Sequence, residues 1–170
     1  MVTKTANGIA RIFTPVSHRK LYTQPWTIFF KLIKNSITDP KDRGTLWFYG
    51  SHPKWIIEAT EEAELKENYP LVIMPNIEVT NQNNLTMDYS AKEYVPQITT
   101  EIFSDRNDYL DIITENITQI ILDNESFLTS IGIYNIKISS DNVDPNTTRD
   151  GLKIYHRILS FTFEVVTECL

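Results

Sequence analysis

The sequence predicts an α+β fold in which a mostly antiparallel β-sheet packs against two α-helices. Two segments carry apolar residues at helical spacing, and several others show the alternation or the short apolar runs that are typical of β-strands. The two strand-like segments near the C-terminal end flank an Asp- and Asn-rich stretch, which indicates a hairpin. Two helices beside antiparallel strands form two layers, and we expect both helices to cover one face of one sheet.

Length and composition indicate one domain of ordinary size. A chain of 170 residues buries roughly 70% of the surface that its unfolded form exposes, so its core needs neither a disulfide nor a metal. Cys169 is the one cysteine, which excludes an intrachain disulfide, and no catalytic motif surrounds it. The sequence holds neither a membrane-length apolar run nor the apolar core of a signal peptide, so we expect a soluble intracellular protein.

Residues 1–22 show no apolar periodicity, and we interpret them as an extended N-terminal arm in front of a single domain over residues 23–170. Pro25 follows a possible cap, Thr23, at the start of an amphipathic segment that predicts a helix from Pro25 to Ile37. Three aromatic residues lie on the apolar stripe of this helix: Trp26, Phe29 and Phe30. We interpret the stripe as core, or as surface that is buried against a neighbouring subunit.

The middle of the chain alternates between strand-like and polar segments. Residues 45–50 and 54–59 are rich in β-forming residues. A polar run follows them and contains Glu61, Glu62 and Glu64. Residues 71–79 predict a buried strand, in which Pro75 implies a bulge or an edge position because proline donates no ladder hydrogen bond. The polar stretch 80–91 predicts a flexible loop. This loop includes four consecutive amide residues: Asn81, Gln82, Asn83 and Asn84.

The second half of the chain has the clearer pattern. Residues 94–103 alternate between two faces, which predicts a strand, and Ser104 or Asp105 is placed to cap a helix directly after it. We expect this helix to extend to Asn124, because its leucine and isoleucine residues form one stripe. Its aspartates gather near the N-terminal end, where the helix dipole is positive.

Two further predicted strands, residues 133–140 and 152–166, flank the stretch from Asp141 to Asp150. The spaced aspartate and asparagine residues of this stretch allow a calcium loop as an alternative to a hairpin turn. The calcium pattern fails at two positions, since Arg149 replaces the turn glycine and Tyr155 replaces the closing glutamate. Turn chemistry explains every residue of the stretch, so we interpret it as a metal-independent hairpin turn.

The charge balance disfavours a protein that grips nucleic acid. The chain has 16 basic and 22 acidic residues, for a net charge of −6, whereas strong backbone binding needs clustered Lys and Arg. The basic cluster His18-Arg19-Lys20, with Lys4 and Arg11 upstream, is interpreted as a solvated part of the arm. An acidic protein is still suited to a channel through which DNA slides without sticking.

No pattern in the sequence points to catalysis or to a cofactor. The histidines at positions 18, 52 and 156 show no metal-ligand spacing, and no nucleophile or phosphate-loop motif is present. His156 lies mid-strand beside Arg157, and we interpret it as a surface or subunit-contact residue rather than as a general base. The sequence therefore favours a binding or structural module over an enzyme, and we expect neither a cofactor nor a metal.

The order of these segments, over about residues 24–166, resembles the tail terminator, or tail-completion, proteins of long-tailed bacteriophages. In that family a tyrosine-proline pair opens a strand, a mid-chain strand leads into a long helix, and the last long strand follows a Ser-Asp loop. The corresponding residues here are Tyr69-Pro70, Ile98 to Ser104 followed by Asp105 to Asn124, Ser140-Asp141-Asn142, and Lys153 to Val165. The N-terminal arm and the predicted loop near residues 80–91 lie outside the resemblance.

The resemblance implies a sheet packed on two helices and a homohexameric ring on the last ring of the tail tube. Such a ring halts tube polymerisation and presents the surface on which the filled head docks. The implied partners are further copies of the chain, the tail tube protein and a head-completion or neck protein. DNA passes through the ring without specific binding, and no membrane is involved. We accordingly expect assembly in the host cytoplasm and a final place in the neck of the virion tail.

On this interpretation, the candidate interface residues are Trp26, Phe29, Phe30, His156 and Arg157. The candidate lumen residues are Glu61, Glu62 and Glu64, with an outward-facing solvated run as the alternative. Two other functions stay open at this point. One is another head-tail neck component, an adaptor or stopper, although those proteins are commonly helical or small β-barrel folds. The other is an intracellular enzyme with a dispersed site, which acids converging around magnesium or a basic cleft would favour.

Overall fold

The structure is a computed structural model, and it describes residues 23–42, 48–50, 69–75, 77–84, 91–147, 151 and 153–168. The described elements are, in chain order, helix α2 (Thr23–Ser36), strands β1 (Phe48–Tyr49), β2 (Leu71–Ile73), β3 (Ile77–Asn84) and β4 (Ala91–Ser104), helices α5 (Asn107–Asp123) and α6 (Glu125–Ser130), and strands β5 (Ile133–Thr147) and β6 (Lys153–Glu168). The predicted N-terminal arm lies outside this part of the chain. None of the described helices is both long enough and apolar enough to cross a membrane.

The described strands form one sheet with the order β1-β2-β4-β6-β5, and β3 pairs with β4 next to β2. β1 and β2 run parallel, whereas the other described pairs are antiparallel. β4 and β6 occupy the centre and pair over nearly their whole length, from Ala91 opposite Glu168 to Ser104 opposite Tyr155. The predicted α+β class with a mostly antiparallel sheet is confirmed.

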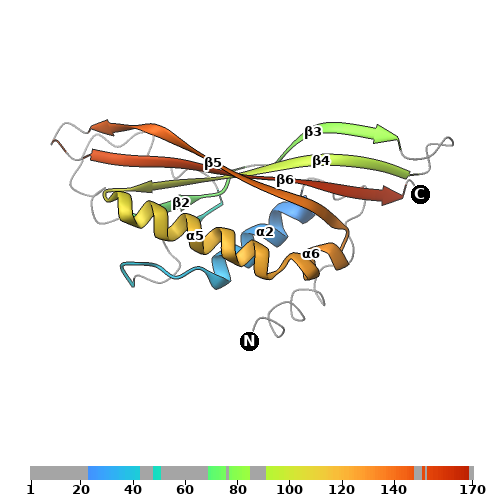
Figure 1. Cartoon of the computed structure of the whole chain (residues 1–170), viewed down its shortest axis with the longest axis horizontal. Coiled ribbons are helices and arrows are strands. Elements are labelled where there is room, and N and C mark those ends of the chain that lie inside the picture. Colours follow the sequence, from blue (N-terminus) through green and yellow to red (C-terminus); the bar gives the residue numbers. More distant parts are fainter. Residues whose placement is uncertain are drawn as a thin grey trace.

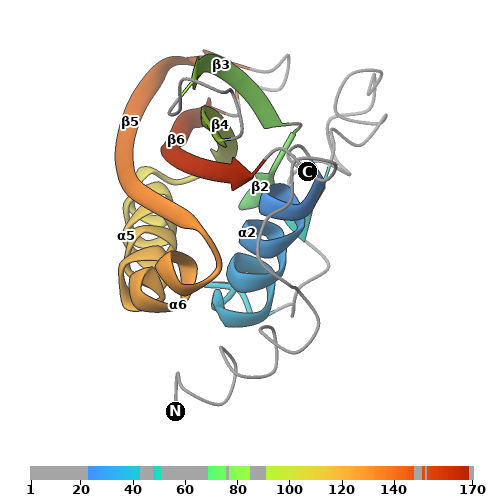
Figure 2. The same cartoon turned by 90° about the vertical axis from the view of Figure 1, so that its right-hand side faces the viewer.

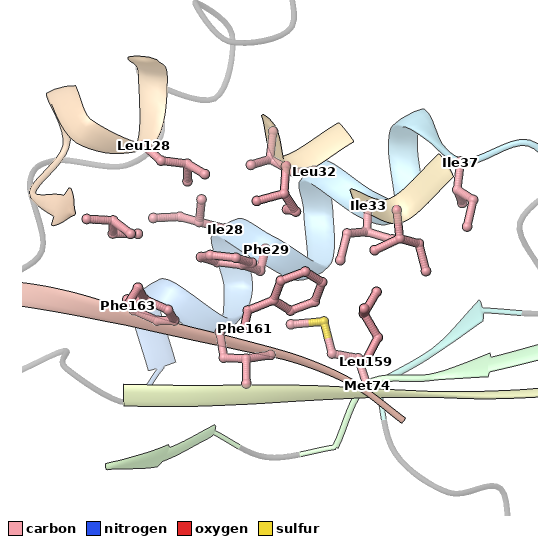
Figure 3. Close-up of a cluster of buried hydrophobic side chains, with 14 of the residues drawn as sticks. Ile28, Phe29, Leu32, Ile33, Ile37, Met74, Leu128, Leu159, Phe161 and Phe163 are labelled. Carbon is pink, nitrogen blue, oxygen red and sulfur yellow. The ribbon is translucent and has the colours of Figure 1, made fainter. Parts of the chain in front are cut away.

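Both long helices lie on one face of the sheet, as the sequence predicts. α2 and α5 run side by side, and α6 follows the end of α5 (Figures 1 and 2). Figure 3 shows apolar side chains of α2 packed on those of β6. The Phe29 ring lies 5.6 Å from the Phe161 ring and 5.1 Å from the Phe163 ring, measured between centroids. Burial of large aromatic rings is a leading favourable term in folding, so this contact joins the two layers.

The two-residue period of a strand divides the sheet into two different faces. On β4, Ile98, Thr100 and Ile102 are fully buried toward the helices, while the residues between them are half-buried on the other face. Four buried apolar residues of β6 recur at every second position: Leu159, Phe161, Phe163 and Val165. A smaller apolar cluster forms away from this main core and contains Tyr69, Leu71, Ile73 and Ile154, with Phe103 against it.

α5 begins slightly later than predicted. Its N-cap residue is Arg106, whose side chain makes no capping hydrogen bond, so the predicted caps Ser104 and Asp105 are wrong. The Ser104 hydroxyl oxygen instead accepts a hydrogen bond from the Arg106 backbone N–H at 3.1 Å, in the turn between β4 and the helix. The short helix α6 is not predicted by the sequence pattern, and its buried Phe127 and Leu128 attach it to the core.

Pro75 divides the predicted strand 71–79 into β2 and β3. Ile73 pairs with Glu101 and Ile77 pairs with Ile98. The chain therefore advances by four residues from β2 to β3 where the opposing strand β4 advances by three. Met74 and Pro75 lie between the two paired segments, so the ladder with β4 is interrupted at the proline, which donates no ladder hydrogen bond. β3 then continues to the end of the amide run, which pairs with β4. The predicted loop is therefore wrong for Asn81, Gln82, Asn83 and Asn84. Residues 85–90 lie outside the described residues.

β5 and β6 form the predicted hairpin, with a longer paired region than expected. Asp141 pairs with Ile158 and Val143 pairs with His156, so this acidic stretch continues the strand. A register shift between Val143 and Asn146 accommodates Pro145, which has no N–H to donate to the ladder. The pairing of the two strands as a hairpin is confirmed, but the turn predicted for Asp141 to Asp150 is wrong for residues 141–147, which belong to β5. Residues 148–150 lie outside the described residues.

Candidate interaction surfaces

The exposed side of α5 forms a continuous stripe along the helix. Its members recur at intervals of three and four residues, as the positions of one helix face do. They are Asp108, Asp111, Ile112, Glu115, Gln119, Leu122 and Asp123, and we call them the acidic stripe. The opposite side of the helix carries the buried Leu110, Ile113, Ile117 and Ile121. The stripe is therefore the surface that α5 presents to anything outside the subunit.

Two of the four carboxylates of the acidic stripe pair with arginines, and the other two have no cationic partner among the described residues. Asp108 bonds to Arg106, and Asp111 lies 2.8 Å from the Arg157 guanidinium. Among the described residues, no cation lies within ion-pair distance of Glu115 or Asp123. The hydrogen bond between the exposed Asp108 and Arg106 lowers the pKa of the Asp108 carboxyl, so this carboxylate is charged well below neutral pH. Two exposed apolar residues interrupt the stripe, with Ile112 at 44% and Leu122 at 52% exposure.

Several carboxylates of α5 stand where an isolated helix prefers other residues. Asp123 is the last residue of α5, near the negative end of the helix dipole, and no basic residue is present in the last turn. Asp111 and Glu115 are four residues apart, a spacing at which like charges repel by a few tenths of a kcal/mol. Each of these placements lowers the stability of the helix. Several unfavourable placements on one surface are typical of a surface that binds a partner.

Trp26 and Phe30, two of the predicted interface residues, form a stacked pair on the side of α2. Their ring centroids lie 4.9 Å apart, and the ring planes are inclined by 12°. The Trp26 indole N–H donates a hydrogen bond to the Pro75 carbonyl oxygen at 2.5 Å, which ties α2 to the break between β2 and β3. Both side chains are half-buried. Their role in a subunit interface stays a prediction.

Phe29 does not belong to any surface. It is fully buried between α2 and the sheet, against Phe161 and Phe163. The interface assignment of this residue is therefore wrong, because no neighbouring subunit can contact a side chain that the core encloses. The helical spacing places Phe29 and Phe30 on one apolar stripe, but only the position of the sheet decides which of them is buried.

His156 and Arg157 cannot act as one contact site, because neighbouring residues of a strand point to opposite faces. The His156 ring stacks on Phe103 at a centroid distance of 4.2 Å. Its Nε2 atom lies 3.2 Å from the Glu101 Oε2 atom, a distance that suits an ion pair at an angle that does not suit a hydrogen bond. Both of these side chains are mostly buried, at 17% and 19% exposure.

Arg157 points the other way, toward the helices. Its guanidinium contacts Asp111 on α5 at 2.8 Å and donates hydrogen bonds to Asn142 on β5 at 2.7 Å and to Thr114 on α5 at 3.2 Å. These contacts within the chain account for the buried arginine without a neighbouring subunit. Arg157 therefore joins the hairpin to α5.

β5 forms one edge of the described sheet, since it pairs with β6 and with no other described strand. Residues 139–145 are exposed, so this part of the strand stands clear of the core. Lys137, Asp141, Asp144 and Pro145 hinder open-ended pairing with further strands. These residues protect the edge against uncontrolled association.

The functional residues that the sequence predicts do not include the acidic stripe. The aspartates near the start of α5 are explained by the helix dipole, but this reason does not cover Glu115 or Asp123. A helix of 17 residues with no basic residue is the signal that could have found the stripe. The predicted lumen residues Glu61, Glu62 and Glu64 lie outside the described residues.

Among the residues that the structure describes, no three acidic, histidine or cysteine side chains are grouped so that they could hold a metal ion. Comparison of the sequence with models of known protein families finds no match, and comparison with curated proteins finds no relative.

Proposed function

We propose that this protein forms a ring that caps a bacteriophage tail tube, stops its polymerisation and provides the docking surface for the head around a DNA channel. The support is the order and placement of its elements. A helix precedes the strand that follows Tyr69-Pro70, the long strand β4 leads into the long helix α5, and the β5–β6 hairpin ends the domain. Both long helices cover one face of the sheet, which is the arrangement that the resemblance implies (Figure 1).

The described surface is compatible with assembly into a ring. Closed rings use heterologous interfaces, in which one patch of a subunit contacts a different patch of the next. The subunit offers two patches of different character, the β5 edge of the described sheet and the acidic stripe of α5, and β5 and α5 lie on the same side of the subunit in Figure 2. Further copies of the chain, the tail tube protein and a head-completion or neck protein are the partners of such a ring.

The charge of the protein suits a channel through which DNA moves. With a net charge of −6, the chain carries no excess of cations with which to hold phosphates, and a wall without cations lets the polymer slide. In this proposal, Glu61, Glu62 and Glu64 line the wall of the channel. The assembled protein belongs to the virion neck, after assembly in the host cytoplasm.

A phage that lacks this gene tests the proposal. We expect tail tubes of irregular and excessive length together with DNA-filled heads that are not joined to tails. The wild-type gene supplied in trans should restore joined particles with tubes of uniform length. Tubes of normal length that are already joined to heads in the deletion phage would rule the proposal out.

Negative-stain imaging of the purified protein provides a second test. We expect ring-shaped particles with a central hole, and we expect these particles to stop the growth of tubes made from the tail tube protein. If the purified protein is instead monomeric and cleaves DNA, the structural role is wrong and the enzyme alternative is supported.

A further inference from the structure

Positive and negative charge are segregated along this chain. Residues 1–38 contain six basic residues and no acidic one, and the basic residues are Lys4, Arg11, Arg19, Lys20, Lys31 and Lys34. All 22 acidic residues follow, against the 10 basic residues that are left of 16. Surfaces of small domains usually intersperse both signs. The segregation therefore provides two regions of opposite charge that attract each other within one subunit or between subunits.

The acidic stripe of α5 and the N-terminal segment, residues 1–22, are complementary in more than net charge. On the stripe, Ile112 and Leu122 are exposed apolar residues among the carboxylates. In the segment, apolar residues follow basic ones directly, as in Arg11-Ile12-Phe13 and in Arg19-Lys20-Leu21-Tyr22. A partner that combines cations with apolar side chains satisfies both kinds of group on the stripe, which an inorganic cation or a polycation without apolar residues does not.

We propose that the acidic stripe of α5 binds the N-terminal segment, residues 1–22, of a second copy of this chain. This inference rests on the proposed ring and names the contact that joins its subunits. A segment from one subunit and a stripe on the next form a heterologous contact, because the two patches differ. Each subunit then donates one segment and accepts another, and repetition of the contact with a rotation that divides a full turn closes the proposed ring.

The contact has a measurable electrostatic signature. Lys4, Arg11, Arg19 and Lys20 bring four positive charges to a stripe on which Glu115 and Asp123 have no ion-pair partner among the described residues. Salt shortens the range of this attraction, since the Debye length falls from about 30 Å at 0.01 M to about 8 Å at 0.15 M ionic strength. Self-association should weaken as salt rises and should also weaken when Ile112 and Leu122 are replaced by serine.

Two charge-reversed variants test the proposal in the full-length protein. The stripe variant carries Glu115→Lys and Asp123→Lys, and the segment variant carries Arg19→Glu and Lys20→Glu. We expect each variant alone to self-associate at least roughly tenfold more weakly than wild type. The stripe variant places two lysines opposite the basic segment, and the segment variant lowers the charge of the segment's four basic positions from +4 to zero. Sedimentation velocity and native mass spectrometry measure the association, and circular dichroism checks that each variant folds.

Mixing the two variants in equal amounts identifies the partner. The reversed stripe of one variant faces the reversed segment of the other, and the remaining stripe and segment are both wild type. A heterologous contact between copies is therefore restored in the mixture, to nearly the wild-type association. If the segment binds the stripe of its own chain, the variant that carries all four substitutions recovers but the mixture does not, and this result overturns the proposal.

Matched controls separate the stripe from net charge. Glu78→Lys with Asn35→Lys and Ser36→Lys makes the same charge change as the stripe variant at exposed positions of β3 and α2, away from the β5 edge. Lys153→Glu with Asn35→Glu and Ser36→Glu matches the charge change of the segment variant at exposed positions of β6 and α2. Both controls should associate as wild type does. Loss of association in the controls to the same degree as in the test variants would overturn the proposal, and so would a wild-type protein that stays monomeric.

The outcomes also separate this inference from the proposed function. If the protein forms a ring that caps tail tubes and none of the four substitutions changes its association, the proposed stripe contact is wrong and the proposed function still stands. If mixing the two variants restores association but the protein caps no tubes, the stripe contact is supported and the proposed function is wrong.

Discussion

Arg157 on β6 and Asp111 on α5 approach to 2.8 Å across the boundary between the sheet and the helices. The two partners differ in environment, because 13% of the Arg157 side chain is exposed and 52% of the Asp111 side chain is exposed. The same guanidinium also donates to Asn142 and Thr114. The arginine therefore contributes through several bonds that are largely shielded from water, whereas water screens the single contact of the aspartate.

This asymmetry predicts unequal effects of replacing the two residues. Arg157→Met should lower the free energy of unfolding by about 1–3 kcal/mol, since two hydrogen bonds and an ion pair are lost together. Asp111→Asn should lower it by less than about 1 kcal/mol. Urea denaturation followed by far-ultraviolet circular dichroism measures both. Equal losses from the two substitutions would show that the ion pair, and not the set of bonds around the guanidinium, carries the stabilisation.

Gly50 leaves no room for a larger residue beside Trp26. A Cβ atom at Gly50 would lie 2.9 Å from Cη2 of the indole, closer than real Cβ contacts. Gly50→Ala should therefore displace the indole and destabilise the protein by about 1–3 kcal/mol. In a Trp26→Phe background, which lacks the clashing atom, the same substitution should cost at least about 1 kcal/mol less. Additive effects in this double-mutant cycle would exclude the steric explanation.

Tyr69 makes folding sensitive to alkaline pH. Burial raises the pKa of its hydroxyl group, and the negative charge of Asp105 raises it further. The folded protein thus holds this proton more tightly than the unfolded chain does, so the stabilisation is complete below the ordinary tyrosine pKa of about 10 and is lost as the pH rises above it. Tyr69→Phe should reduce the loss of stability above about pH 10. Tyr134→Phe, at a residue with 39% exposure, serves as the control and should leave the alkaline loss unchanged.

Calcium should not stabilise the β5–β6 hairpin. Asp141 and Asp144 lie in β5 and are exposed. Asp141 pairs with Ile158, and Asp144 lies within the register shift between Val143 and Asn146. Micromolar calcium should leave the Tm unchanged relative to magnesium at equal ionic strength, as thermal unfolding can measure. A rise of several degrees that disappears in an Asp141→Asn, Asp144→Asn variant would indicate a calcium site, because a ligand that binds the folded state raises its stability.

The sequence predicts the helices and strands in which apolar residues recur with a regular period. α2 and α5 carry apolar stripes of helical period, and β4 and β6 alternate over many residues. The amide-rich end of β3 lacks such a pattern, because its pairing with β4 is a tertiary effect and asparagine is uncommon in strands. α6 is only 6 residues long and has no side-chain cap to mark it.

The candidate interface residues show a different limit. Composition draws attention to Trp26, Phe29 and Phe30, but exposure depends on where the sheet lies, and the sheet buries Phe29. His156 and Arg157 could have been separated from the sequence alone, since the predicted strand places neighbours on opposite faces. The acidic stripe was within reach as well, because its residues follow the same helical period as the buried ones.

Among the described residues, Ile154 is the buried residue of the β5–β6 hairpin nearest its tip, where it belongs to the smaller apolar cluster and pairs with Asn146. The length of the hairpin beyond this pair is therefore free to drift in evolution. A gain or loss of two residues in each strand keeps every other side chain on its face, whereas one residue turns the rest of the strand over. Related chains should therefore differ in this hairpin by even numbers of residues per strand, and a strand with an odd difference should carry a compensating bulge.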